Sequence, residues 1–139
     1  MTYAAGRSLQ AAIYDRLISD AGIEALLSGA VFDDVPIDAP NLFVAIGPEK
    51  VRGIGDSSGE GAVHELTISA VTRREGYLAA KAVAVAVSDS LAGTELTLAR
   101  GRLVSLRFVR AETKRDKAEG TRRIDLIFRA RTDDTGPRA

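Results

Sequence analysis

Hydrophobic residues at helical spacing predict that the chain opens with two helices. Within residues 8–18, apolar side chains recur at helical intervals while Asp15 and Arg16 fall on the opposite side, which is typical of an amphipathic helix. Asp20 then provides a carboxylate that can accept hydrogen bonds from the free N–H groups of a second, short helix, and Gly29 provides its end. We therefore expect a helical hairpin at the start of the chain.

Four later segments have the pattern of β-strands. Residues 42–46 form a continuous apolar run with branched side chains, which predicts a buried strand. Residues 63–72 alternate apolar with polar side chains, as in a strand with one covered face. Residues 104–109 and 124–131 repeat this alternation, and the segment 114–120 joins them. The last two strands are therefore predicted to form a hairpin.

One further helix and two connectors complete the pattern. Residues 77–91 have an apolar side chain at every fourth position, and Gly93 supplies the end of this predicted helix. Residues 31–40 contain two prolines and three aspartates, so we interpret them as a connector with at most a short extended piece. Residues 50–61 contain four glycines and two serines between two strand-like runs, which predicts a long, mobile hairpin loop.

The order of these elements favours an α+β fold in a single domain. The order is helix, helix, strand, strand, helix, strand, strand, with the strands grouped into two hairpins. Such grouping predicts a mainly antiparallel, four-stranded sheet with the helices packed on one face. We expect residues 1–131 to form the domain and residues 132–139 to be a flexible tail. The second face of the sheet is predicted to be polar and available to another subunit.

Composition excludes most catalytic chemistry. The 139 residues include no Cys and a single His, so thiolate nucleophiles, Cys-ligated metals and redox pairs are excluded, and schemes based on His are weak. A chain of this length buries roughly 65–70% of its unfolded surface, so it needs no disulfide or metal to form a core. The longest apolar stretch, residues 82–87, is far below the ~18–20 residues that cross a bilayer, so we expect a soluble protein made in a cytoplasm.

The charge is neutral overall but unevenly distributed. The chain has 19 Lys and Arg against 19 Asp and Glu, which argues against general adhesion to nucleic acid. Residues 1–99 hold 7 basic and 13 acidic side chains, a net charge of −6, whereas residues 100–139 hold 12 basic and 6 acidic, a net charge of +6. A split of this size predicts a subunit with oppositely charged surfaces.

No motif in the chain specifies a chemistry. Residues 53–59 differ from a dinucleotide fingerprint by one residue in their glycine spacing, and a strand follows where that motif needs a helix N-terminus. His64 follows two serines, but no carboxylate is spaced to orient it, so we interpret it as a partly buried, hydrogen-bonded side chain. The aspartate pairs at 33–34 and 133–134 are typical of solvated turns. We therefore predict no catalytic residue, cofactor or metal.

The last predicted hairpin is rich in basic side chains. No aromatic platform is interleaved with them, and acidic residues interrupt the run, so a site that stacks bases is not indicated. Two interpretations stay open: a solvated hairpin with cross-strand ion pairs, or a contact with an acidic neighbouring subunit or a passing duplex. The basic residues are Arg107, Arg110, Lys114, Arg115, Lys117, Arg122, Arg123, Arg129 and Arg131.

Several segments, in order along nearly the whole chain, resemble one family. They are residues 3–6, 9–14, 31–36, 40–47, 65–71, 80–83, 101–108 and 121–131. Together they resemble the tail terminators of long-tailed phages, and they are most similar to the version carried by gene transfer agents, the phage-derived particles that package host DNA. The resemblance implies a hexameric ring that caps the tail tube, stops its polymerisation and provides the surface on which the DNA-filled head docks. It implies no catalytic residue.

The resemblance also implies partners and a location. The expected partners are further copies of the chain, the tail-tube protein, a head-side stopper or connector protein, and double-stranded DNA during its passage through the ring. No membrane partner is expected. The protein is expected in the bacterial cytoplasm during assembly and then in the neck or tail of a phage-like particle.

Two segments and three arginines are the candidates for assembly. The loop 50–61 and the hairpin tip 112–122 are predicted to contact the next ring or subunit, and the arginines to lie at a subunit interface or along the DNA channel. The candidates are Arg52, Gly53, Gly55, Asp56 and Gly59 in the loop, Lys114, Arg115, Lys117 and Arg122 at the tip, and Arg107, Arg129 and Arg131. The alternatives are a head-to-tail stopper or adaptor, a small enzyme or ligand-binding domain using His64 and the glycine loop, and a nucleic-acid-binding regulator.

Overall fold

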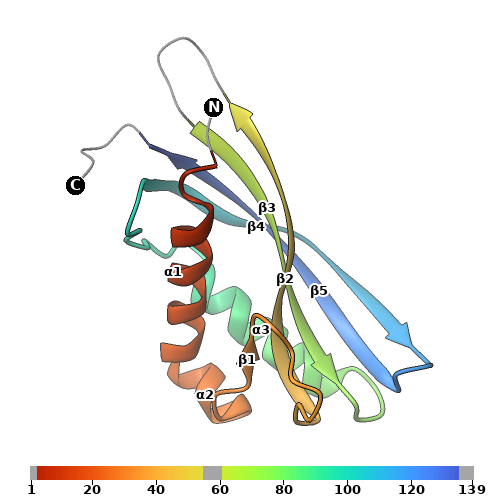
Figure 1. Ribbon diagram of the computed structural model, residues 1–139. Helices are drawn as coiled ribbons and strands as arrows, with labels where there is room; N and C mark the ends of the chain where they lie inside the picture. Colours follow the sequence, from red (N-terminus) through yellow and green to blue (C-terminus); the bar gives the residue numbers. More distant parts are fainter. Residues whose placement is uncertain (1–2, 55–60, 135–139) are drawn as a thin grey trace.

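The computed structural model, which describes residues 3–54 and 61–134, contains three helices and five strands in that part of the chain (Figure 1). In chain order they are α1 (Gly6–Ser19), α2 (Ala21–Leu27), β1 (Val31–Phe32), β2 (Leu42–Ile54), β3 (Gly61–Thr72), α3 (Leu78–Leu91), β4 (Arg102–Asp116) and β5 (Thr121–Asp133). The α+β class, the three helices and the two strand hairpins predicted from the sequence are confirmed.

The predicted four-stranded antiparallel sheet is wrong in one respect, because the connector adds a fifth strand. The sheet has the order β1-β2-β3-β5-β4, in which β1 runs parallel to β2 and all other pairs are antiparallel. Val31 is 2% exposed and pairs with Val44, whose N–H donates to the Ala30 carbonyl at 2.9 Å. Two apolar residues are enough to form this strand because the second strand already offers a free edge beside them.

The predicted loop at residues 50–61 is also shorter than expected. Strand β2 continues to Ile54 and β3 begins at Gly61, so residues 50–54 pair in register with residues 61–65. The ladder tolerates glycine at Gly53, which lies opposite Ala62. A register shift between Ile46 and Glu49 interrupts the pairing. Residues 55–60 lie outside the described part of the chain.

Helix ends follow the local signals in the sequence. The Asp20 carboxylate accepts a hydrogen bond from the N–H of Ile23 at 3.0 Å, as predicted for the start of α2, and this bond lowers the pKa of Asp20. Ser28 and Gly29 both have positive φ and end α2 with a left-handed turn. No helix in the described residues is long and apolar enough to span a membrane.

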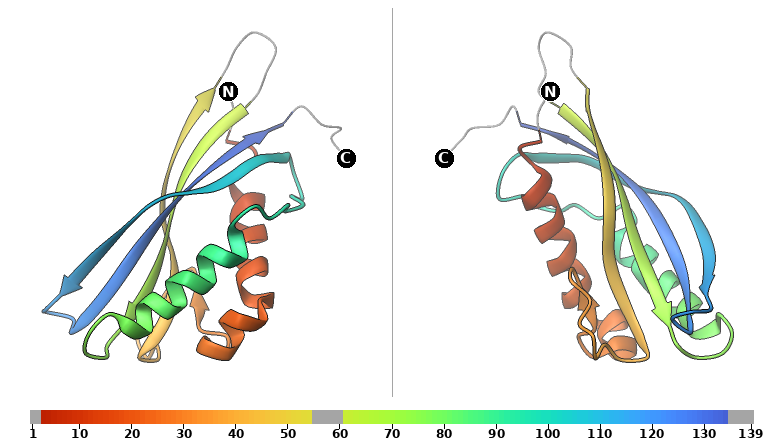
Figure 2. Two further views of the ribbon diagram at one scale, coloured as in Figure 1. Left: turned by 180° about the vertical axis from the view of Figure 1, so that it is seen from behind. Right: turned by 45° about the vertical axis from the view of Figure 1, so that its right-hand side comes forward.

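The helices cover one face of the sheet and form the core with it. Figure 2 shows α1 and α3 side by side on that face, with α3 crossing β3 and β5. Leu9, Ile13 and Leu17 of α1 are at most 1% exposed, and Phe128 at the centre of β5 is fully buried. The core therefore lies between the two long helices and the inner side chains of the three central strands.

The β4–β5 hairpin is longer than predicted and less regular. Its strands continue to Asp116 and from Thr121, and β5 runs through Asp133, into the segment predicted as a tail. Register shifts on either side of Val104 and Val109 break the alternation of β4. Phe108 still lies on the same face as Leu106, as the alternation predicts, but on this outer strand Val104 and Phe108 are 43% and 45% exposed.

We expect Leu17→Ala to lower the free energy of unfolding by about 2–5 kcal/mol, because it leaves a cavity under α1 where the side chain is fully buried. The matched change Leu78→Ala removes the same atoms from a side chain that is 84% exposed and should change stability by less than about 0.5 kcal/mol. Urea unfolding followed by circular dichroism measures both. Equal losses would contradict the assignment of the core.

Candidate assembly interface

The face of the sheet opposite the helices is open in the described part of the chain (Figure 2). Its side chains alternate with those of the core along each strand, so one row across the sheet reads Lys50, Glu65, Arg129 and Arg107 from β2 to β4. We call this surface the open face. A hollow of about 600 Å³ lies over it. Apolar Phe43, Val71 and Ile127 in the hollow are less than 9% exposed.

Near the β4–β5 turn the open face carries a balanced ion network around Asp125. The Asp125 side chain is 8% exposed and accepts a hydrogen bond from the Ser69 hydroxyl at 2.7 Å. The Lys114 ammonium and the Arg123 guanidinium lie 3.1 and 3.0 Å from its two oxygens. The buried carboxylate therefore has one hydroxyl donor and two cations beside it, which offset the cost of taking its charge out of water.

The same network extends to the edge strand. Arg110 bridges Glu65 at 3.6 Å and Glu112 at 3.5 Å, and Glu112 also lies 4.0 Å from Lys114. In this part of the open face, cations and carboxylates therefore neutralise one another. The sequence interpretation of cross-strand ion pairs is correct here.

The other part of the open face carries arginines without a carboxylate partner. Arg107 lies directly opposite Arg129 in the β4–β5 ladder, and Arg52 and Arg131 lie on either side of Val63 in the next row. No ion pair joins these four arginines to any carboxylate in residues 3–54 and 61–134. Like charges directly opposite one another destabilise a strand pair. We call these four residues the arginine cluster, and they form a surface that favours an anionic partner.

The remaining predicted residues are not all brought to this surface. Arg122 lies on the helix side, where it donates to the Arg74 carbonyl at 3.2 Å and stacks 6.0 Å from the Tyr77 ring centre. Arg115 lies opposite Arg122 in the ladder, and Lys117 is exposed in the β4–β5 turn. Gly53 belongs to the β2–β3 ladder. Gly55, Asp56 and Gly59 lie outside the described residues.

His64 is fully buried on the helix side of β3, deeper than predicted. Its Nε2 atom lies 2.9 Å from the Thr132 hydroxyl, and its Nδ1 atom lies 3.7 Å from one oxygen of Glu49. The Tyr3 hydroxyl donates a hydrogen bond to the other oxygen of Glu49, and this bond raises the pKa of Tyr3. Burial lowers the pKa of His64, and the nearby Glu49 opposes this only in part. The ring is therefore a neutral structural group at pH 7.

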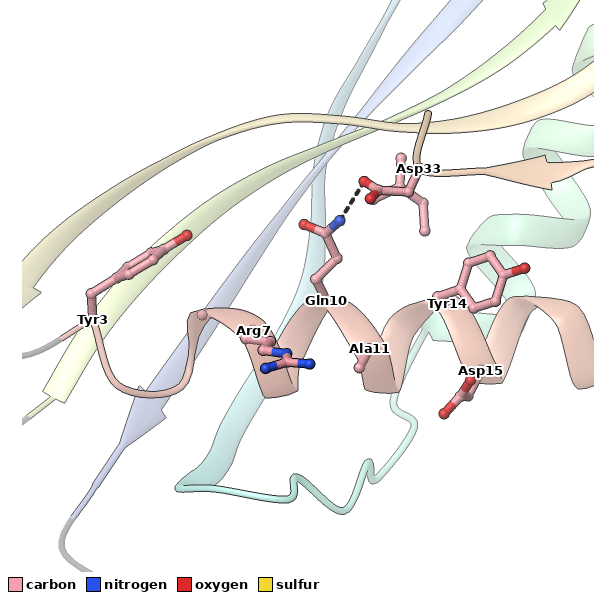
Figure 3. Close-up of a pocket in the computed structure, with 9 residues that line it drawn as sticks. Tyr3, Arg7, Gln10, Ala11, Tyr14, Asp15 and Asp33 are labelled. Carbon is pink, nitrogen blue, oxygen red and sulfur yellow. Dashed lines mark hydrogen bonds between the residues drawn. The ribbon is translucent and has the colours of Figure 1, made fainter. Parts of the chain in front are cut away.

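The residues that contact His64 are distant from it in the sequence, so no local pattern predicted them. A groove was missed for the same reason, because its lining comes from separate segments of the chain. This groove, about 500 Å³, lies along α1 and reaches Ile46 of β2. Figure 3 shows Gln10 rising from α1 toward Asp33, to which it donates a hydrogen bond at 2.6 Å. We call it the α1 groove; its lining is Tyr3, Gly6, Arg7, Gln10, Ala11, Tyr14, Asp15, Asp33 and Ile46.

The uneven charge of the sequence corresponds to two edges of the sheet. Residues 1–49, which build α1, α2, β1 and the start of β2, hold 2 basic and 7 acidic side chains. Strand β4, residues 102–116, holds 5 basic and 2 acidic side chains. Because β1 and β4 are the two ends of the strand order, Asp33 and Asp34, which follow β1, lie at the opposite edge of the sheet from the basic side chains of β4. No group of three or more His, Asp or Glu in the described residues is arranged to hold a metal ion.

The sheet therefore has one open charged face and two edges that differ in charge. The sequence matches the family described as tail completion protein gp17 over residues 11–133, and the chain belongs to this family. A search of curated proteins gives no match.

Among solved structures, one chain described under "Virion of native gene transfer agent (GTA) particle" is 47% identical, with a TM-score of 0.90, and the match covers 95% of this chain and 99% of that chain. The family and this likeness support a structural tail protein, and the resemblance found in the sequence is confirmed. Both matches are to structural virion proteins, which are not enzymes.

We expect Asp125→Ala to lower the free energy of unfolding by about 1–3 kcal/mol, because it leaves the Ser69 hydroxyl and two cations without their shared acceptor. The control Glu112→Ala removes a carboxylate that is 52% exposed on the same face and should cost less than about 1 kcal/mol. Urea unfolding at pH 7 compares the two. A larger loss for the Glu112 variant would contradict the role given to Asp125.

Acid should destabilise the fold through His64. The pKa of His64 is lowered in the folded state, so the unfolded chain, whose pKa is about 6.5, binds the proton more readily. The contribution of neutral His64 to the free energy of unfolding is therefore fully present above about pH 6.5. It decreases as the pH drops below this value, by at most about 1.4 kcal/mol per pH unit. Since His64 is the chain's one histidine, His64→Gln should flatten urea unfolding free energies measured between pH 7.5 and 5.5. An unchanged slope would refute this.

Proposed function

We propose that this protein is a tail terminator, which forms a ring on the end of the tail tube, ends the polymerisation of the tube and joins it to the DNA-filled head. The observation that carries this proposal is the likeness to a chain of the gene transfer agent particle, because at 47% identity it extends over nearly the full length of both chains. A structural subunit of this size acts through its surfaces, so the proposal depends on which surface meets which partner.

The two charged edges support a ring. In a head-to-tail ring each subunit presents two different patches, one to each neighbour, and the patches must be complementary. The acidic edge at β1 and the basic edge at β4 satisfy this condition, because rotation about a central axis brings one against the other. The number of subunits is taken as six from the resemblance.

The arginine cluster supports a role for the open face along the central channel. A duplex that passes through a ring carries negatively charged phosphates, and unpaired guanidinium groups attract these phosphates without reading the base sequence. The balanced network around Asp125 adds little to such a field because its charges cancel locally. We therefore assign Arg52, Arg107, Arg129 and Arg131 to the channel wall. The hairpin tip 112–122 and the rest of the segment 50–61 are assigned to contacts with the next ring.

The remaining partners follow from the same proposal. The ring meets the tail-tube protein on one side and the head-side stopper or connector on the other. Assembly takes place in the bacterial cytoplasm, and the protein then stays in the neck of the particle. Negative-stain electron microscopy of the purified protein with tail tubes tests the proposal directly. A sixfold ring at one tube end is expected, and binding to head portals instead of tubes would identify a stopper or adaptor.

We expect Arg129→Glu combined with Arg131→Glu to leave the fold intact and to reduce DNA-filled particles, because it reverses the charge of the proposed channel wall. The control combines Arg74→Glu with Lys81→Glu, which changes the net charge equally at exposed positions away from the open face. Tail length, head joining and DNA transfer of complemented particles are measured. If the Arg129 and Arg131 variant left all three normal, these arginines would have no role in the channel.

A further inference from the structure

Two strand edges of the subunit have no partner in the described part of the chain. Strand β1 pairs only with Val44 and Ala45, so β2 has a free edge over residues 46–54. Strand β4 pairs with β5 on one side, and its other edge is free over all of Arg102–Asp116. Free edges expose rows of backbone N–H and C=O groups that can pair with another strand.

The free edge of β2 runs beside the α1 groove. Ile46, the first residue of β2 beyond its pairing with β1, forms one wall of this groove, and Tyr3, Ala11 and Tyr14 contribute much of its apolar lining. A strand added to β2 at this edge would place every second side chain over the groove, because side chains alternate between the two faces of a sheet. The groove therefore fits an extended segment with an apolar side chain on its helix side.

Strand β4 carries such a side chain. Phe108 lies opposite Phe128 on the helix side, with their ring centres 5.9 Å apart, yet it is 45% exposed because α3 packs mainly on the neighbouring strands. Val104 on the same strand is 43% exposed. A large apolar side chain that is half-exposed on an unpaired strand edge is unusual for a surface that remains in contact with solvent.

The direction of β4 and its charge also fit the free edge of β2. Strand β2 is antiparallel to β3, and β3 to β5, so β4 runs antiparallel to β2. A head-to-tail neighbour would therefore add its β4 to β2 as an antiparallel strand, with both helix layers on the same side of the joined sheet. Asp15 and Asp33 at the groove then face the basic strand.

We propose that β4 of a second copy of this chain adds to the free edge of β2 and places its Phe108 in the α1 groove. The inference rests on the proposed ring and specifies its subunit contact. The register shifts around Val104 and Val109, and Pro48 on β2, interrupt both edges, so they restrict pairing to a short segment and disfavour open-ended sheets.

The absence of native cysteine makes a cross-linking test clean. In the double variant Ala11→Cys, Phe108→Cys, one thiol lines the groove beside Ile46 of β2 and the other is on β4. Within one subunit β2 and β4 are three strand spacings apart, about 14 Å, which exceeds the reach of a disulfide. Mild oxidation of assembled protein should therefore produce a ladder of covalent multimers. The control Ala82→Cys, Phe108→Cys moves one thiol to an exposed position of α3 outside the groove and should give no ladder.

A second pair of variants avoids any change to the Phe108–Phe128 contact. Ala11→Arg fills the α1 groove from an exposed helix position, and it should raise the concentration needed for ring assembly about tenfold or more with the melting temperature of the monomer unchanged. Ala82→Arg, the matched change on α3, should assemble normally. Light scattering and electron microscopy, with and without tail tubes, measure assembly.

The outcomes separate this inference from the proposed function. Rings that form on tube ends without the cysteine ladder, and that tolerate Ala11→Arg, would overturn the strand pairing and leave the tail terminator role standing. A chain that stays monomeric with tail tubes present, and gives no ladder, would overturn both. A ladder together with assembly loss in Ala11→Arg supports the pairing.

Discussion

The antiparallel ladder between β3 and β5 is the constraint on which the rest of the structure depends. Its register places Leu66 against Phe128 on the helix side and Glu65 against Arg129 on the open face. Because side chains alternate, a slip of one residue would turn the core outward and bury the charges, so the register is strongly specified. The helix layer, the ion network and the arginine cluster all take their positions from this one pairing.

The charges of the open face are divided by the same geometry. Where Asp125 lies under Ser69, Lys114 and Arg123, burial and pairing stabilise one another, and the surface is neutral. Two rows further along, Arg107 and Arg129 face each other with no carboxylate partner among the described residues. A subunit alone gains nothing from this arrangement, since like charges repel. The repulsion is relieved when an anionic partner lies against the face, which is the physical basis for assigning it to a DNA channel.

Assembly and folding are linked through the edges of the sheet. The strand order has two ends: one is the short β1, which Asp33 and Asp34 follow, and the other is the long, basic β4. Placing opposite charges at opposite ends favours contact between copies in one orientation and disfavours contact of either edge with itself. The buried His64 of β3 contacts Thr132 of β5 and Glu49 of β2, and so links three neighbouring strands of the sheet. It is therefore a structural element of the subunit.

Local patterns in the sequence determined the helices, the two hairpins, the lack of motif chemistry and the family, because helical spacing, alternation, Asp20 and Gly29 act over a few residues. The sequence also contained the charge imbalance, but its meaning depended on which strands lie at the edges. The β1 strand, the bulges of β4, the exposure of Phe108, the partners of His64 and the α1 groove were decided only by the tertiary structure. Each of these joins residues that are distant in the sequence or depends on the register of a strand, and no local spacing encodes such contacts.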